Sequence, residues 1–67
     1  MGVDVDQLYR RYAPMVLRRC RVLLRHEARA VDAMQDVFVL VLRHQHELQA
    51  GSGASLLFRL ATNVCLN

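Results

Sequence analysis

The residues best equipped for chemistry in this sequence share one face of the helix that we expect over residues 27–47. At about 100° per residue, two carboxylates, an amide, two guanidinium groups and two aliphatic side chains fall on one strip there. We call this the mixed strip, and it comprises Arg29, Asp32, Gln35, Asp36, Val39, Leu40 and Arg43. Such a surface suits docking against another helix, because aliphatic side chains supply contact area while charges fix register and orientation. The alternative is that Val39 and Leu40 are isolated surface hydrophobes, which are common and need no function.

Cysteine and histidine give little support for disulfides or for a metal site. Cys20 and Cys65 are too few and too widely separated for a disulfide framework or a paired-cysteine zinc motif, and each is typical of a small core residue. The alternative is a metal site that combines Cys20 with the histidines. It is weak, because helical geometry directs His44 and His46 about 200° apart and no carboxylate cluster accompanies them. We expect no bound metal and no cofactor.

Catalysis has equally little support. Ser52 and Ser55 lie in a glycine-containing segment without a general base at a recognisable spacing. Residues 51–53 also lack the lysine of a phosphate-binding loop. The chain is therefore not expected to be an enzyme.

Composition indicates one small domain with an excess of positive charge. The chain has 67 residues, is 54% hydrophobic and 22% charged, and carries a net charge of +3. These fractions are typical of a folded globular chain. No apolar run is long enough to cross a bilayer, and the N-terminus lacks the features of a secretory signal. We expect a cytoplasmic protein without membrane insertion.

All nine basic residues are arginines, and five of them gather on one side of the first expected helix. This arginine stripe comprises Arg10, Arg11, Arg18, Arg21 and Arg25. The opposite side is apolar and comprises Leu8, Tyr12, Val16, Cys20 and Leu23. One interpretation is that the stripe follows the phosphates of a nucleic acid, with salt-dependent binding. The preferred interpretation is a solvated helix face.

Three helices and no strand are expected to position these residues, in a compact all-α three-helix bundle. They cover about residues 5–24, 27–47 and 54–66. Asp4 or Asp6 is expected to cap the first helix and Ser52 the third, and Pro14 to kink or briefly break the first. The expected buried faces of the second and third helices comprise Val31, Met34, Val37, Phe38 and Val41, and Leu57, Leu60, Ala61 and Val64.

Three blocks of sequence, in this order, resemble conserved region 2 of bacterial sigma-70 family sigma factors. They are LYRRYAP at residues 8–14, VDAMQDVF at 31–38 and LLFRLATNVCL at 56–66. The resemblance is greatest to the extracytoplasmic-function (ECF) group. It covers nearly the whole chain and implies a single region 2 domain over residues 1–67.

The resemblance implies a partner for the mixed strip. In such proteins the second helix docks on the coiled-coil clamp helices of the RNA polymerase β′ subunit. The residues that it implicates in polymerase binding are Asp32, Gln35, Asp36, Val39, Leu40 and Arg43. Gln35 and Asp36 match the family's most recognisable dipeptide. An anti-sigma protein that masks the strip is a further candidate partner.

The resemblance also implies that the last loop and the third helix read and help melt the promoter minus-ten element. Loop 49–55 would hold a flipped-out base of the non-template strand, and Arg59 and Asn63 would approach the backbone and base edges. The residues implicated in DNA binding are Gln49, Ser52, Ser55, Arg59 and Asn63. The family commonly opens this helix with Trp, but Leu56 takes that place here, so we expect no aromatic to stack on an unpaired base. Alternatively, Asn63 caps or cross-links helices and Arg59 is solvated.

Two other functions remain open. One is a small helical protein–protein interaction module that pairs through Val39 and Leu40 without nucleic acid. The other is a small DNA-binding protein that uses the arginine stripe. The chain stops at Asn67, where the family continues into a basic helical end and then a separate region 4 domain for the minus-thirty-five element. We expect an excised domain rather than a truncated relative with another role.

Overall fold

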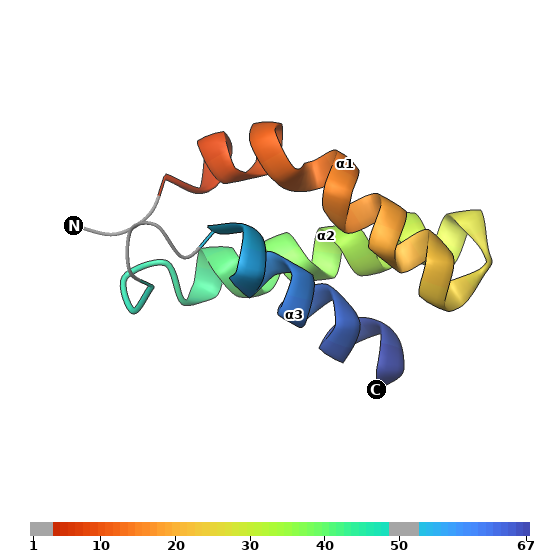
Figure 1. The fold of residues 1–67 in the computed structure, drawn as a ribbon. Coiled ribbons are helices and arrows are strands. Elements are labelled where there is room, and N and C mark those ends of the chain that lie inside the picture. Colours follow the sequence, from red (N-terminus) through yellow and green to blue (C-terminus); the bar gives the residue numbers. More distant parts are fainter. Residues whose placement is uncertain (1–3, 49–52) are drawn as a thin grey trace.

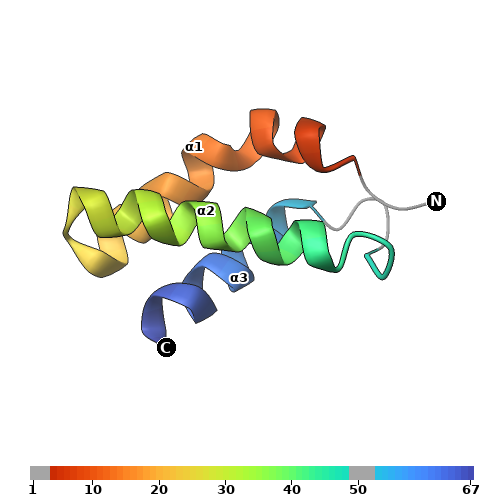
Figure 2. The ribbon, with the colours of Figure 1, turned by 180° about the vertical axis from the view of Figure 1, so that it is seen from behind.

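The structure, a computed structural model, describes residues 4–48 and 53–67, which form three helices and no strand. The helices are α1 (Val5–Leu24), α2 (Glu27–Arg43) and α3 (Gly53–Leu66). Each helix packs against the other two. Seen from behind, α2 runs along the bundle with α1 above it and α3 below it (Figure 2). The expected all-α three-helix bundle is confirmed.

The first helix has the expected bounds, and polar groups close both its ends. Asp4 is the N-cap, and its Oδ1 accepts a hydrogen bond of 3.2 Å from the backbone N–H of Gln7. Arg25 ends the helix in the left-handed conformation, with φ 53°, and its N–H donates to the carbonyl of Arg21 at 2.9 Å. The helix α2 then begins two residues later, so α1 and α2 form a tight helical hairpin.

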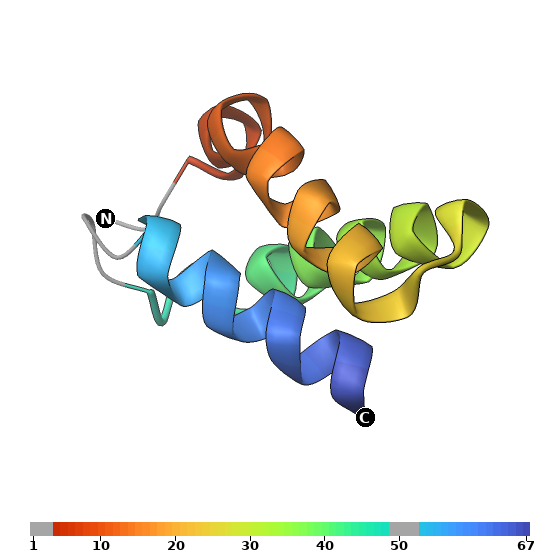
Figure 3. The same ribbon diagram turned by 45° about the vertical axis from the view of Figure 1, so that its right-hand side comes forward.

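Pro14 bends α1 without interrupting it. The helix is continuous from Val5 to Leu24, and its axis changes direction between the red and the orange turns (Figures 1 and 3). Proline has no N–H, so the carbonyl of Arg10 loses its usual helical donor. The predicted kink is therefore present, and the alternative of a short break is not.

The second helix ends four residues earlier than expected, at Arg43 rather than at residue 47. Residues 44–47 form a turn in which the N–H of Glu47 donates to the carbonyl of His44 at 2.9 Å. Gln45 Nε2 also donates to the carbonyl of Leu42 at 3.2 Å. These polar groups satisfy carbonyls at the helix end, and the next apolar side chain, Leu48, packs against the core. The helix ends early because the run His44–Glu47 has no apolar residue to hold another helical turn.

The core confirms most of the expected buried faces. The buried residues are Val16, Cys20, Ala30, Ala33, Met34, Val37, Phe38, Val41, Leu57 and Ala61. Val31, which was expected in the core, is half-buried, and Ala30 and Ala33 are buried beside it. Leu60 and Val64 are half-buried and pack against the same cluster. Across the α1–α2 contact, the rings of Tyr9 and Phe38 meet edge to face with centroids 5.0 Å apart.

The start of α3 lies directly against α1. A Cβ atom at Gly53 would lie 2.9 Å from Tyr12 Cε2 and 3.3 Å from Leu8 Cδ2. Glycine therefore permits a close approach that a larger residue would obstruct. The helix begins one residue before the expected position 54, and the expected cap Ser52 lies outside the described residues.

Candidate functional site

The mixed strip lies on the face of α2 that points away from the core. Its charged and amide side chains are all exposed, Val39 is 44% exposed, and Leu40 is half-buried. In the view from behind, neither of the other two described helices lies over α2 (Figure 2). Within residues 4–48 and 53–67, none of the four charged residues of the strip forms an ion pair. The strip thus offers both signs of charge to a partner.

A shallow groove extends the strip toward α1. It has a volume of about 310 Å³ and is lined by Val5, Asp6, Tyr9, Gln35, Phe38, Val39 and Leu42. Tyr9 and Leu42 are 43% and 53% exposed, which is unusual for such large apolar surfaces side by side. Gln35 and Val39 belong to both the strip and the groove. Sequence reasoning missed the contribution of α1, because periodicity within one helix carries no information about the neighbouring helix.

A second cavity lies on the other side of the strip, between the end of α2 and the start of α3. Its volume is about 280 Å³, and it is lined by Leu40, Val41, His44, Glu47, Leu48, Leu56 and Leu60. Leu40 therefore forms the border between this cavity and the mixed strip. Leu56, which stands where the resembled family has Trp, belongs to the apolar wall of the cavity.

The third helix presents the three expected DNA-binding residues that the structure describes. Ser55, Arg59 and Asn63 are exposed, and their spacing of four residues places them along one face of α3. Gln49 and Ser52 lie outside the described residues. The predicted groups on α3 therefore lie in a row, each about one helical turn from the next.

An exposed aromatic on α3 was missed by sequence reasoning. Phe58 is 46% exposed, and the guanidinium carbon of Arg19 lies 4.5 Å from its ring centroid. Arg19 Nε donates to Thr62 Oγ1 at 3.2 Å, and that hydroxyl donates to the carbonyl of Phe58 at 3.0 Å. Phe58, Arg19 and Thr62 form what we call the α1–α3 clasp. Phe58 lies outside the apolar periodicity of α3. That position was the signal in the sequence that the ring would be exposed.

Most of the arginine stripe is engaged within the domain. Arg10 pairs with Asp6 at 3.2 Å. Arg21 makes two hydrogen bonds to Glu27, of 2.9 Å and 2.7 Å, which raise the pKa of Arg21 and lower that of Glu27. Arg11 stacks on the ring of Tyr12, 5.5 Å from its centroid. These contacts favour the interpretation of the stripe as a solvated face rather than a phosphate track.

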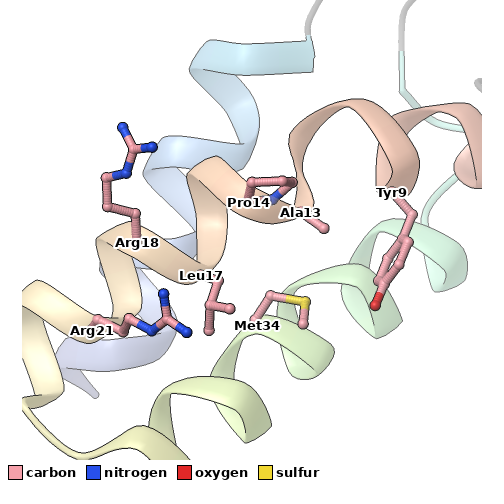
Figure 4. Close-up of a pocket in the computed structure, with 7 residues that line it drawn as sticks. All are labelled: Tyr9, Ala13, Pro14, Leu17, Arg18, Arg21 and Met34. Atoms are coloured by element: carbon pink, nitrogen blue, oxygen red, sulfur yellow. The ribbon is translucent and has the colours of Figure 1, made fainter.

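A pocket of about 360 Å³ lies beside the bend in α1. It is lined by Tyr9, Ala13, Pro14, Leu17, Arg18, Arg21 and Met34 (Figure 4). Arg18 points away from Met34, whereas Arg21 extends toward Leu17, so the two guanidinium groups do not converge on one point. The pocket thus combines apolar side chains beside the bend with two arginines that do not form an anion cradle.

The two cysteines are free, and the structure brings them close together. Burial raises the pKa of the Cys20 thiol to about 12, with a further contribution from the neighbouring Cys65 thiol. The described residues contain no group of three or more metal-ligating side chains. A buried neutral thiol of this kind is chemically inert.

Comparison with known proteins identifies the family. The sequence model of the Sigma-70 region 2 family matches residues 8–67. Curated proteins and solved structures give no significant match. None of the described helices has the length and apolar character needed to span a bilayer. The match covers most of the chain, which therefore belongs to the Sigma-70 region 2 family, the sigma factor domain that acts with core RNA polymerase and promoter DNA in transcription initiation.

Proposed function

We propose that this domain belongs to an ECF-group sigma factor and that the mixed strip of α2 docks on the coiled-coil clamp helices of the polymerase β′ subunit. The observation that carries the proposal is the strip itself: exposed charges of both signs beside Val39 and Leu40, on the side of α2 opposite the core. The residues assigned to this contact are Asp32, Gln35, Asp36, Val39, Leu40 and Arg43.

Geometry beside the strip supports a helical partner. The groove formed with α1 supplies apolar surface from Tyr9 and Leu42 next to the charges of α2. A helix that lay along α2 would bury this apolar surface while its own charges met Asp36 and Arg43. An anti-sigma protein that covers the same surface would compete with polymerase.

We also assign α3 and residues 49–52 before it to recognition and melting of the minus-ten element. Ser55, Arg59 and Asn63 share an exposed face of α3, and the helix contains no acidic residue that would repel phosphates. Gln49 and Ser52, which precede α3 in the sequence, complete the proposed DNA-binding set. Because these residues lie on a different helix from the mixed strip, the two contacts are separable by mutation.

A titration against a peptide of the β′ clamp helices tests the polymerase contact. Asp36→Arg is expected to weaken binding by about tenfold or more, because a misplaced charge at an interface costs several kcal/mol. Gln35→Ala is expected to have a smaller effect in the same direction. Both side chains are exposed, so helicity and the unfolding midpoint should not change.

Glu47→Arg is the matched control for this titration. Glu47 is an exposed carboxylate in the turn after α2 and lies outside the mixed strip. Its reversal changes net charge by the same amount as Asp36→Arg and should leave affinity within about twofold of the parent. If the two variants lost affinity equally, the effect would be one of long-range electrostatics. The mixed strip would then not be part of the interface.

The DNA contact is tested by promoter opening in a holoenzyme whose sigma factor carries this domain. Arg59→Ala and Asn63→Ala should reduce opening while leaving the clamp-helix titration unchanged, since neither residue lies on α2. If either substitution weakened clamp-helix binding as much as opening, the assignment of separate roles to α2 and α3 would be wrong.

A second candidate function is self-association through the exposed apolar groove. Val39 and Leu42 are 44% and 53% exposed, and two copies could cover them mutually. Dimerisation of the isolated chain at low micromolar concentration, abolished by Val39→Asp, would favour this interaction module over the polymerase contact.

A further inference from the structure

The two free cysteines lie where α1 and α3 pack against each other. Arg19 and Thr62 join these helices through the 3.2 Å hydrogen bond from Nε to Oγ1. Cys20 follows Arg19 on α1, and Cys65 lies about one helical turn after Thr62 and after the buried Ala61 on α3. Figure 3 shows the second half of α1 beside the end of α3. The packing of the two helices thus brings together two thiols that are 45 positions apart in the sequence.

Both cysteine side chains belong to the same apolar cluster. Cys20 is 0% exposed and is part of the core, and Cys65 is half-buried and packs against that core. The neighbouring Cys65 thiol contributes to the raised pKa of Cys20, which agrees with two thiols that lie side by side. The arrangement is that of a dithiol pair between two helices, with one sulfur from each.

The two thiols differ in their access to solvent. Cys20 has no exposed surface, so a dissolved oxidant does not reach its sulfur while the domain is folded. Cys65 keeps part of its surface exposed near the end of α3. Oxidation of cysteine depends on exposure as well as on thiolate character. Cys65 is therefore the thiol that an oxidant reaches first, and Cys20 is placed to react with the oxidised product.

We propose that Cys20 and Cys65 form a redox-sensitive pair, which hydrogen peroxide converts into a disulfide between α1 and α3. This inference is independent of the proposed polymerase and DNA contacts. In the first step the Cys65 sulfur attacks one peroxide oxygen and the O–O bond breaks, which gives a sulfenic acid and one water. In the second step the Cys20 sulfur attacks the sulfenic sulfur and the S–O bond breaks. The hydroxyl leaves with the Cys20 proton as a second water.

The two steps balance in atoms and electrons. Two thiols and one hydrogen peroxide give one disulfide and two waters, so the two sulfurs together lose the two electrons that the peroxide gains. The disulfide would hold α1 against α3 and close a loop of 45 residues, which restricts the unfolded chain and so favours the folded one. The stability of the domain would then depend on its redox state. The competing explanation is that both cysteines only fill space in the core.

Oxidation of the native chain tests the proposal. The reduced chain, at low micromolar concentration, is treated with excess hydrogen peroxide for increasing times, and the remaining thiols are alkylated and counted by mass spectrometry. We expect a monomer with an internal disulfide and no alkylated cysteine. Its unfolding midpoint should rise by about 10 °C or more, and dithiothreitol should reverse the rise.

Two variants separate the roles of the thiols, and a third is the matched control. Cys20→Ala should stop at the sulfenic acid of Cys65, which dimedone traps. Cys65→Ser should leave Cys20 unmodified while the domain is folded. The control is Asn63→Cys in the Cys65→Ser background, because it keeps two thiols but moves one of them to an exposed position on α3. It should form no internal disulfide and show no rise in the unfolding midpoint.

Three results would overturn the proposal. The first is a sulfinic acid at Cys65 while Cys20 remains free. The second is a disulfide that forms only between two chains or only in urea. The third is an internal disulfide that forms as fast in the Asn63→Cys control as in the parent. The main result comes from the parent chain, so it does not depend on a variant that folds poorly.

Discussion

At the scale of single residues, burial distinguishes the side chains that stabilise the core from those that are free to react. Met34, Val37, Phe38 and Val41 were predicted from helical periodicity to be buried, and they are. The burial of Ala30 and Ala33 was not predicted, because periodicity is read from large apolar side chains and gives small residues little weight. Sequence could identify Cys20 as a core residue. Its closeness to Cys65, 45 positions later in the chain, depends on how α1 and α3 pack.

The buried Cys20 thiol predicts a dependence of stability on alkaline pH. Burial raises its folded-state pKa from 9.0 to about 12, so the neutral thiol contributes stability that is fully present below about pH 9 and is lost as the pH rises toward 12. Urea unfolding of the parent should therefore show a steeper loss of stability above about pH 9 than Cys20→Ala does. Parallel losses in the two proteins would contradict the assignment.

Phe38 is expected to be indispensable for folding. It is 6% exposed and meets Tyr9 edge to face, and deletion of a buried ring costs about 3–5 kcal/mol. A domain of this size has little more than that in total, so Phe38→Ala should be largely unfolded by circular dichroism. Val39→Ala, at the adjacent but exposed position, should melt within a few degrees of the parent. A cooperative melt of Phe38→Ala near that of the parent would disprove this role.

At the scale of helices, the sequence predicts that a helix is present, and which of its faces is buried, better than it predicts where the helix ends. The bounds of α1 follow from its N-cap and from the turn at Arg25, and both of its ends agree with the prediction. The predicted end of α2 is too late, because residues 44–47 are polar and such a run is compatible with an exposed helical turn as well as with a non-helical turn. There, hydrogen bonds of Gln45 and Glu47 close the helix instead. Propensity alone did not distinguish this turn from a further helical turn.

The approach of α3 to α1 at Gly53 yields a prediction about packing. Alanine is usually better than glycine in helices by up to about 1 kcal/mol, but its Cβ here would lie 2.9 Å from Tyr12 Cε2. Gly53→Ala should therefore lower stability by about 1–3 kcal/mol through overpacking. In a Tyr12→Leu background, where the ring is absent, the same substitution should cost little or nothing. Chemical denaturation of the four proteins tests this, and an equal cost in both backgrounds would refute the clash.

At the scale of the whole molecule, the two proposed contacts use different surfaces of one small bundle. The mixed strip could be predicted from the sequence of α2, because all its members lie on one helix. The groove between α1 and α2 and the α1–α3 clasp could not, since each combines residues from two helices. The family resemblance supplied the identity of the partners, which no pattern of charge or hydropathy contains. The match to Sigma-70 region 2 over residues 8–67 confirms that family.

The docking of α2 on the clamp helices is tested most directly by a double-mutant cycle between Asp36 and basic residues of the β′ clamp helices. Each basic residue is replaced by Glu in turn, and affinities are measured for the parent chain and for Asp36→Arg. We predict that one pair of reversed charges recovers most of the affinity that Asp36→Arg loses, with a coupling energy above about 1 kcal/mol, as close charge pairs at interfaces give. Affinity of Asp36→Arg equal to that of the parent, with no coupling to any basic residue of the clamp helices, would contradict the proposal.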